Sequence, residues 1–81
     1  MVTEFRLPAS EDILSTARIA AWRKEPGDMI QAGEVLMEVV TEKVNVEVEC
    51  SVTGRVIEVL GTLDDEITVG DVVARIETSS S

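Results

Sequence analysis

Lys43 is the residue of this sequence whose type and position best suit a chemical role. It stands in the segment Thr41-Glu42-Lys43-Val44, between an apolar run that ends at Val40 and a stretch in which valines alternate with polar residues. That alternation has the period of a β-strand with one buried face, and the intervening residues are compatible with a type I turn. A lysine at the tip of such a β-hairpin makes few packing contacts, so its amine is open to a modifying enzyme. The same position also suits a lysine that only solvates a turn.

Few other side chains of the sequence can be assembled into a catalytic or metal-binding site. Histidine is absent and Cys50 is the single cysteine, so neither a Ser-His or Cys-His pair nor a histidine metal site can form. Cys50 also cannot make an internal disulfide, which favours a reducing compartment, and we interpret it as a small half-buried side chain. The paired carboxylates Asp64-Asp65 remain as acid–base candidates, but their place in a turn indicates solvated side chains. We therefore predict no catalytic residue and no metal ligand.

The composition indicates one small, strand-rich domain. The chain has 81 residues, of which 44% are apolar, and its aromatic residues are one Phe and one Trp. The core must therefore be built from Val, Ile, Leu and Ala, and this β-branched bias favours strands. Seven basic and 16 acidic residues give a net charge of −9, which argues against nucleic acid or an anionic membrane as a partner. We find no signal peptide and no long apolar run.

The segment from Ser10 to Glu25 carries conflicting local signals, because Ser10 can cap a helix and the following alanines favour one. An internal repeat resolves the conflict: an offset of 37 residues places Ala17-Arg18-Ile19 over Gly54-Arg55-Val56 and continues without a gap. The later matches are Asp28 with Asp65, Ile30 with Ile67, Gly33 with Gly70, Glu34 with Asp71, Val35 with Val72, Val39 with Ile76 and Thr41 with Thr78. Since the second copy is strand-like over residues 55–60, we predict a strand rather than a helix over residues 18–23.

Each copy of the repeat has the same predicted order of strands and turns. The first strand leads to a turn at Pro26-Gly27 or Leu63-Asp64, where the second residue needs a positive φ. A short apolar segment then leads to a second turn at Gly33 or Gly70, and a final strand follows. Neither half can bury its apolar face alone, so we predict an all-β fold in which two antiparallel sheets pack with quasi-twofold symmetry.

The repeat also assigns the core and the direction of the hairpin. The expected core residues are Val39, Val46, Val48, Ile57, Val59, Val73 and Ile76, with Trp22 covering an edge. Lys43 joins the two halves, so it should project from the end of the molecule opposite the termini. We assign residues 1–78 to this domain and residues 79–81 to a linker or tail.

The order of these motifs resembles that of the lipoyl domains of dihydrolipoamide acyltransferases, which are components of 2-oxo acid dehydrogenase complexes. The resemblance covers residues 5–77 and rests on several motifs together. They are Lys24-Glu25-Pro26-Gly27-Asp28, Ala32-Gly33-Glu34-Val35-Leu36, Glu38-Val39-Val40-Thr41-Glu42-Lys43-Val44, Val46-Glu47-Val48-Glu49, Thr53-Gly54 and Val69-Gly70-Asp71. The resemblance implies a flattened barrel-sandwich hybrid of two four-stranded antiparallel sheets.

The resemblance also implies a function for Lys43. In that family the lysine at the hairpin tip is joined by an amide to lipoic acid, added by a lipoate-attaching enzyme. The lipoyl group accepts an acyl group from a thiamine-diphosphate 2-oxo acid decarboxylase, passes it to coenzyme A at a separate acyltransferase catalytic domain, and is reoxidised by dihydrolipoyl dehydrogenase. The chain would then be a non-catalytic swinging-arm carrier, working in the cytoplasm of a bacterium or archaeon or in the mitochondrial matrix.

The sequence departs from the family's usual pattern at two places. The family commonly has Asp before the lysine and Ala after it, whereas Glu42 and Val44 flank Lys43 here. Both changes keep an acid followed by a small apolar residue, so we expect the modification to survive. The loop of residues 9–15 is also atypical. Because in the family this loop packs beside the lipoyl-lysine and helps the decarboxylase recognise its own domain, Glu11 and Asp12 are the candidate recognition residues, unless they are ordinary solvated acids.

Two other functions remain open for the same fold. A biotinyl carrier domain has the same tip lysine, but its tip usually reads Met-Lys-Met, which Glu42 and Val44 do not match. An unmodified barrel-sandwich domain with a structural or adaptor role is the second alternative, although such adaptors place a long helical insertion where this chain has a tight turn. A glycine cleavage H protein would need a longer chain.

Overall fold

A computed structural model describes residues 1–42 and 44–78 of the chain, and these residues form an all-β fold. The strands are β1 (Val2–Arg6), β2 (Thr16–Trp22), β3 (Met29–Ile30), β4 (Val35–Val40), β5 (Asn45–Glu49), β6 (Gly54–Val59), β7 (Glu66–Thr68) and β8 (Val72–Thr78). Residues 79–81, for which a linker or tail is predicted, lie outside the described residues.

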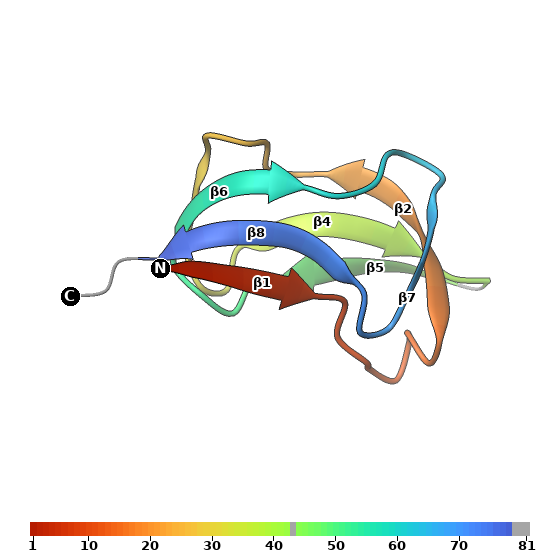
Figure 1. Cartoon of the computed structure of the whole chain (residues 1–81). Helices are drawn as coiled ribbons and strands as arrows, with labels where there is room; N and C mark the ends of the chain where they lie inside the picture. Colours follow the sequence, from red (N-terminus) through yellow and green to blue (C-terminus); the bar gives the residue numbers. More distant parts are fainter. Residues whose placement is uncertain (43, 79–81) are drawn as a thin grey trace.

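The strands form two four-stranded antiparallel sheets, as predicted. One sheet has the order β1-β8-β6-β3 and the other the order β5-β4-β2-β7. The molecule is elongated, with principal extents of 40 × 22 × 18 Å. In Figure 1 the N-terminus lies at one end of the long axis and the connection from β4 to β5 at the other. The hairpin that contains position 43 is therefore presented far from the N-terminus.

The internal repeat is visible in the pairing of the strands. β2 and β4 of the first half correspond to β6 and β8 of the second, and each pair is antiparallel. Residues 18–22 form part of a strand rather than a helix, which confirms the prediction from the repeat. Ala17 and Ile19 are buried while Arg18 faces solvent, so the alternation of a strand outweighs the local helical propensity of the alanines.

The predicted turns are also present in both halves. Asp28 N–H donates to the carbonyl of Glu25 at 2.9 Å, across a turn in which Gly27 has a φ of 100°. In the second half Asp64 occupies the matching position with a φ of 70°, and it is the described non-glycine residue with a positive φ. Asp tolerates this left-handed conformation better than most residues do.

β2 and β6, which correspond to each other in the repeat, each contain a β-bulge at the matching position. The pairing of β2 with β4 shifts between Ile19 and Ala21, and that of β6 with β8 shifts between Val56 and Glu58. A bulge inserts one residue and changes which side chains face inward. Val56 is therefore buried and Ile57 is 38% exposed, so the prediction of Ile57 as a core residue is wrong.

The core lies between the two sheets and consists mainly of aliphatic side chains. Its buried members are Phe5, Leu7, Ile13, Ala17, Ile19, Ile30, Leu36, Met37, Val39, Val48, Cys50, Val56, Ile67, Val73, Ala74 and Ile76. Four of the predicted core residues are among them, and Val46 and Val59 pack against them while partly exposed. Trp22 also packs there, and its indole Nε1–H donates to the carbonyl of Gly61 at 3.1 Å. Cys50 forms no disulfide and is only 2% exposed, so it is more deeply buried than the half-buried side chain predicted from the sequence.

Ion pairs on the outer face of the first sheet connect three strands. The Arg75 guanidinium on β8 contacts the carboxylates of Glu58 on β6 and Glu4 on β1. The hydrogen bond and charge of Glu58 raise the pKa of Arg75 above its ordinary value, with a smaller contribution from Glu4. These groups are exposed, so the network adds little to the stability of the fold. Within residues 1–42 and 44–78, no helix is long and apolar enough to cross a membrane.

Candidate attachment site

β4 ends at Val40 and β5 begins at Asn45, so residues 41–44 connect the two strands of the hairpin. Val40 and Asn45 are the last paired residues of the two strands. Beyond them Thr41 N–H donates to the carbonyl of Val44 at 2.9 Å, which closes the hairpin. Lys43, the predicted attachment residue, lies outside the described residues, but its neighbours Glu42 and Val44 are both exposed. The two residues that flank it are thus held by a closed hairpin and accessible to a partner.

The loop between β1 and β2 lies beside this hairpin and is anchored to the core. The side chain of Ile13 is buried, and Ile13 exchanges backbone hydrogen bonds of 3.0 and 3.2 Å with Ser10. Ser15 accepts a hydrogen bond from Val69 N–H at 2.8 Å. With the loop held at Ile13 and Ser15, the side chains of Glu11, Asp12 and Leu14 are left exposed.

The loop and the hairpin border an open surface hollow of about 530 Å³, which we call the loop hollow. It is lined by Glu11, Asp12, Leu14, Ser15, Thr16, Thr41, Glu42 and Val44. The structure therefore brings the two predicted recognition residues to the same hollow as the two residues that flank Lys43. Whether Glu11 and Asp12 act in recognition stays a prediction.

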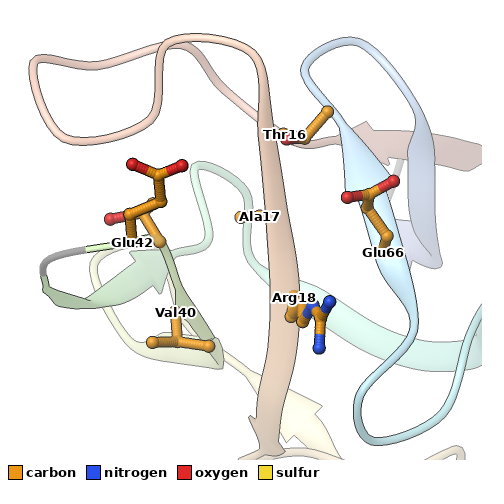
Figure 2. A pocket seen from close by; sticks show the side chains of 7 residues that line it. Thr16, Ala17, Arg18, Val40, Glu42 and Glu66 are labelled. Atoms are coloured by element: carbon orange, nitrogen blue, oxygen red, sulfur yellow. The ribbon is translucent and has the colours of Figure 1, made fainter.

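A second hollow of about 340 Å³, the strand hollow, lies on the sheet next to the same hairpin. It is lined by Thr16, Ala17, Arg18, Val40, Thr41, Glu42 and Glu66. Figure 2 shows Glu42 and Glu66 on either side of β2, from which Arg18 projects. Arg18 was not among the site residues predicted from the sequence. Its pairing with Val40 brings it next to the hairpin, and this pairing is known only from the structure.

Lys24, the other lysine of the sequence, lies in a different environment. Its Nζ is 3.4 Å from Oε2 of Glu34, and about a quarter of its side chain is exposed. It follows β2 at the end that pairs with Met37 rather than at the end near the hairpin. Over the described ranges, no group of three or more Cys, Asp or Glu side chains is arranged to hold a metal ion.

A protein-family model described as "Biotin-requiring enzyme", the biotin/lipoyl family, matches residues 3–76. Among curated proteins, the chain is 37% identical over 75 residues to the dihydrolipoyllysine-residue succinyltransferase component of the 2-oxoglutarate dehydrogenase complex of Bacillus subtilis. It is 36% identical over 74 residues to the dihydrolipoyllysine-residue acetyltransferase component of the pyruvate dehydrogenase complex of Corynebacterium glutamicum. The matches cover 93% and 91% of this chain but 18% and 11% of those relatives, so the chain spans less than a fifth of their length.

Solved structures show the same fold at lower sequence identity. The lipoyl domain of the 2-oxoglutarate dehydrogenase complex from Azotobacter vinelandii superposes with a TM-score of 0.70 at 24% identity, covering 94% of this chain and 98% of that one. The urea carboxylase of Kluyveromyces lactis superposes with a TM-score of 0.80 at 22% identity, covering 95% of this chain and 6% of that one. By family model, by relatives and by fold, the chain belongs to the biotin/lipoyl attachment family, as a lipoyl-type carrier domain of the kind found in the acyltransferase components of 2-oxo acid dehydrogenase complexes.

Proposed function

We propose that this domain carries lipoic acid on Lys43 and delivers it to the active sites of a 2-oxo acid dehydrogenase complex. The observation that carries the proposal is the closed β4–β5 hairpin, which holds Glu42 and Val44 exposed at one end of the molecule. A residue between them is presented to a modifying enzyme, whereas Lys24 is engaged by Glu34. The position of Lys43 in the sequence and the family membership of the chain support the same residue.

The residues around the hairpin fit an attached lipoyl group. The hydrogen bond from Thr41 N–H to the carbonyl of Val44 joins the backbone on the two sides of the attachment position. The loop hollow offers exposed apolar surface from Leu14 and Val44 next to it. When bound, the lipoyl dithiolane supplies the redox and acyl-carrying chemistry, and this chain supplies presentation and recognition.

Lipoic acid is favoured over biotin by the relatives and by the hairpin sequence. The relatives quoted above are named dihydrolipoyllysine-residue transferases. Glu42 and Val44 also differ from the Met-Lys-Met of biotinyl domains. Intact-mass measurement after incubation with either a lipoate-attaching enzyme or a biotin ligase tests this choice. We expect one lipoyl increment and no biotinyl increment, and the reverse result would assign the chain to the biotinyl carriers.

The proposed partners follow from the carrier role. They are a lipoate-attaching enzyme, a thiamine-diphosphate 2-oxo acid decarboxylase, an acyltransferase catalytic domain and dihydrolipoyl dehydrogenase. A tethered group reaches each active site at a high effective concentration, so it need not diffuse freely between them. Some relatives are bacterial, and one from Arabidopsis thaliana is named as mitochondrial. We therefore place the domain in the bacterial or archaeal cytoplasm or in the mitochondrial matrix.

A further inference from the structure

Part of the surface of the loop hollow is apolar. Leu14 is 82% exposed and Val44 is 40% exposed, and both line the hollow. A single exposed leucine is ordinary in a soluble protein. Two apolar side chains that line one hollow, one of them next to the proposed attachment residue, form a surface that an apolar group can cover.

The exposure of Leu14 is built into the loop. Its neighbour Ile13 is buried in the core, and the hydrogen bonds between Ile13 and Ser10 hold the backbone there. Ile13 also donates its N–H to Ser10 Oγ at 3.2 Å. Because Ile13 is directed inward and the following strand begins at Thr16, Leu14 is left on the outer side of the loop. The hollow is thus preformed, and a group that enters it need not reorganise the loop.

The described residues that line the hollow carry charges of one sign. Glu11, Asp12 and Glu42 each contribute a carboxylate, and none of the described lining residues is a lysine or an arginine. The neighbouring strand hollow, which shares Thr16, Thr41 and Glu42 with the loop hollow, differs because Arg18 is among its lining residues. A group with a free carboxylate is therefore repelled from the loop hollow, whereas a neutral group is not, and it can cover the apolar surface of Leu14 and Val44.

In the family this loop packs beside the lipoyl-lysine, and we propose that the loop hollow selects the arm by charge: it accepts an arm with an uncharged acyl group as a resting place but excludes one with a free carboxylate. This rests on the proposed attachment at Lys43. Glu42 and Val44, the neighbours of Lys43 in the sequence, both line the hollow, so an arm on Lys43 is tethered next to residues of the hollow. An intramolecular tether gives an effective concentration on the order of millimolar, so weak apolar contacts are enough to populate the docked arm.

The proposal names a class of 2-oxo acid for the parent complex. Its acyl group would lack a second carboxylate, as an acetyl or branched-chain acyl group does and a succinyl group does not. Sequence similarity does not make this choice, since the quoted relatives include a succinyltransferase at 37% identity and an acetyltransferase at 36%. The three carboxylates of the loop hollow make this choice, because they repel a second carboxylate on the acyl group.

Nuclear Overhauser effects test whether the arm rests in the hollow. The domain is prepared with labelled Leu and Val methyl groups and lipoylated, and its mass is confirmed first. We expect contacts from the protons of the lipoyl arm to the methyl groups of Leu14 and Val44. Leu14→Ser should remove the contacts to Val44 as well as those to Leu14. Leu63 serves as the control, because it is 60% exposed in the turn between β6 and β7. Leu63→Ser should leave the contacts to Val44 unchanged.

Two alkylating reagents of similar size test the effect of charge. The reduced arm is treated with iodoacetamide, which adds a neutral group to each sulfur, or with iodoacetate, which adds a carboxylate. We expect the neutral arm to keep its contacts with Leu14 and the anionic arm to lose them. The double variant Glu11→Gln/Asp12→Asn should restore contacts to the anionic arm.

The outcomes separate this inference from the proposed function. A lipoylated domain whose arm shows no contact with Leu14 or Val44 would overturn the resting site and leave the carrier role intact. Equal contacts from the neutral and anionic arms would overturn the charge selection. Failure to attach lipoate at all would overturn both the proposed function and the inference.

Discussion

At the scale of single residues, glycines at tight turns and at close approaches fix the backbone that carries the hairpin. Gly33 has a φ of 95°, and a Cβ there would meet no atom within 4 Å. Gly54 is different, because a Cβ would lie 2.2 Å from the backbone carbonyl oxygen of Glu77 on β8. The first glycine is required by conformation and the second by space.

Substitution by alanine should distinguish these two roles. Gly33→Ala is expected to cost about 1 kcal/mol, since only backbone strain is added. Gly54→Ala is expected to cost about 3 kcal/mol, because β6 must move away from β8. Urea denaturation followed by the fluorescence of Trp22, the single tryptophan, measures both. Equal losses of stability would contradict the assignment.

At the scale of the strands, the β-bulges decide which side chains enter the core. Ile76 on β8 is completely buried, whereas Ile57 beside the bulge of β6 is 38% exposed. Ile76→Ala should therefore lower the free energy of unfolding by about 4 kcal/mol, and Ile57→Ala by about 1 kcal/mol or less. Urea denaturation of the two variants compares the same chemical change in two environments. A larger loss of stability for Ile57→Ala than for Ile76→Ala would contradict the assignment of the bulge to Ile57.

The strands also show how far the sequence predicts this structure. The repeat predicted β2 correctly over alanines that favour a helix, since the second copy had an unambiguous strand pattern. It predicted the positive φ of Gly27 and Asp64, because the turn geometry requires it. The bulge at Ile57 has no signature in residue type: Val56-Ile57 is equally apolar at both positions, and only the pairing with β8 decides which faces inward.

The site was predictable to a similar degree. The hairpin and its flanking residues Glu42 and Val44 followed from the alternating valines and from the repeat. The loop hollow did not, because residues 9–15 show no periodic pattern and their path depends on the burial of Ile13. Arg18 was missed as well, since an arginine in a strand has an ordinary role until its neighbours across the sheet are known.

At the scale of the whole molecule, the net charge of −9 favours docking on basic surfaces. Glu11 and Asp12 add to this charge at the end that presents the hairpin. We expect the lipoylated variant Glu11→Gln/Asp12→Asn to lower kcat/KM for reductive acylation by the cognate decarboxylase several-fold. Added salt should lower the wild-type value and reduce the difference between the two proteins, because it screens exposed charges.

A variant with the same change in net charge controls for position. Glu47 and Glu49 are exposed on β5, and neither lines the loop hollow. Glu47→Gln/Glu49→Gln should therefore affect kcat/KM less than the loop variant does. Equal effects would show that net charge, and not the loop, governs recognition.

The most direct test of the account is the intact mass of the wild-type domain, Lys43→Gln and Lys24→Gln after incubation with lipoate and a lipoate-attaching enzyme. Circular dichroism first confirms that both variants fold. Because the sequence has two lysines, the pair of variants assigns the modified side chain. The account predicts one lipoyl increment on the wild type and on Lys24→Gln and none on Lys43→Gln. An increment that persists in Lys43→Gln, or its absence from the wild type, would contradict the assignment of Lys43 as the carrier residue.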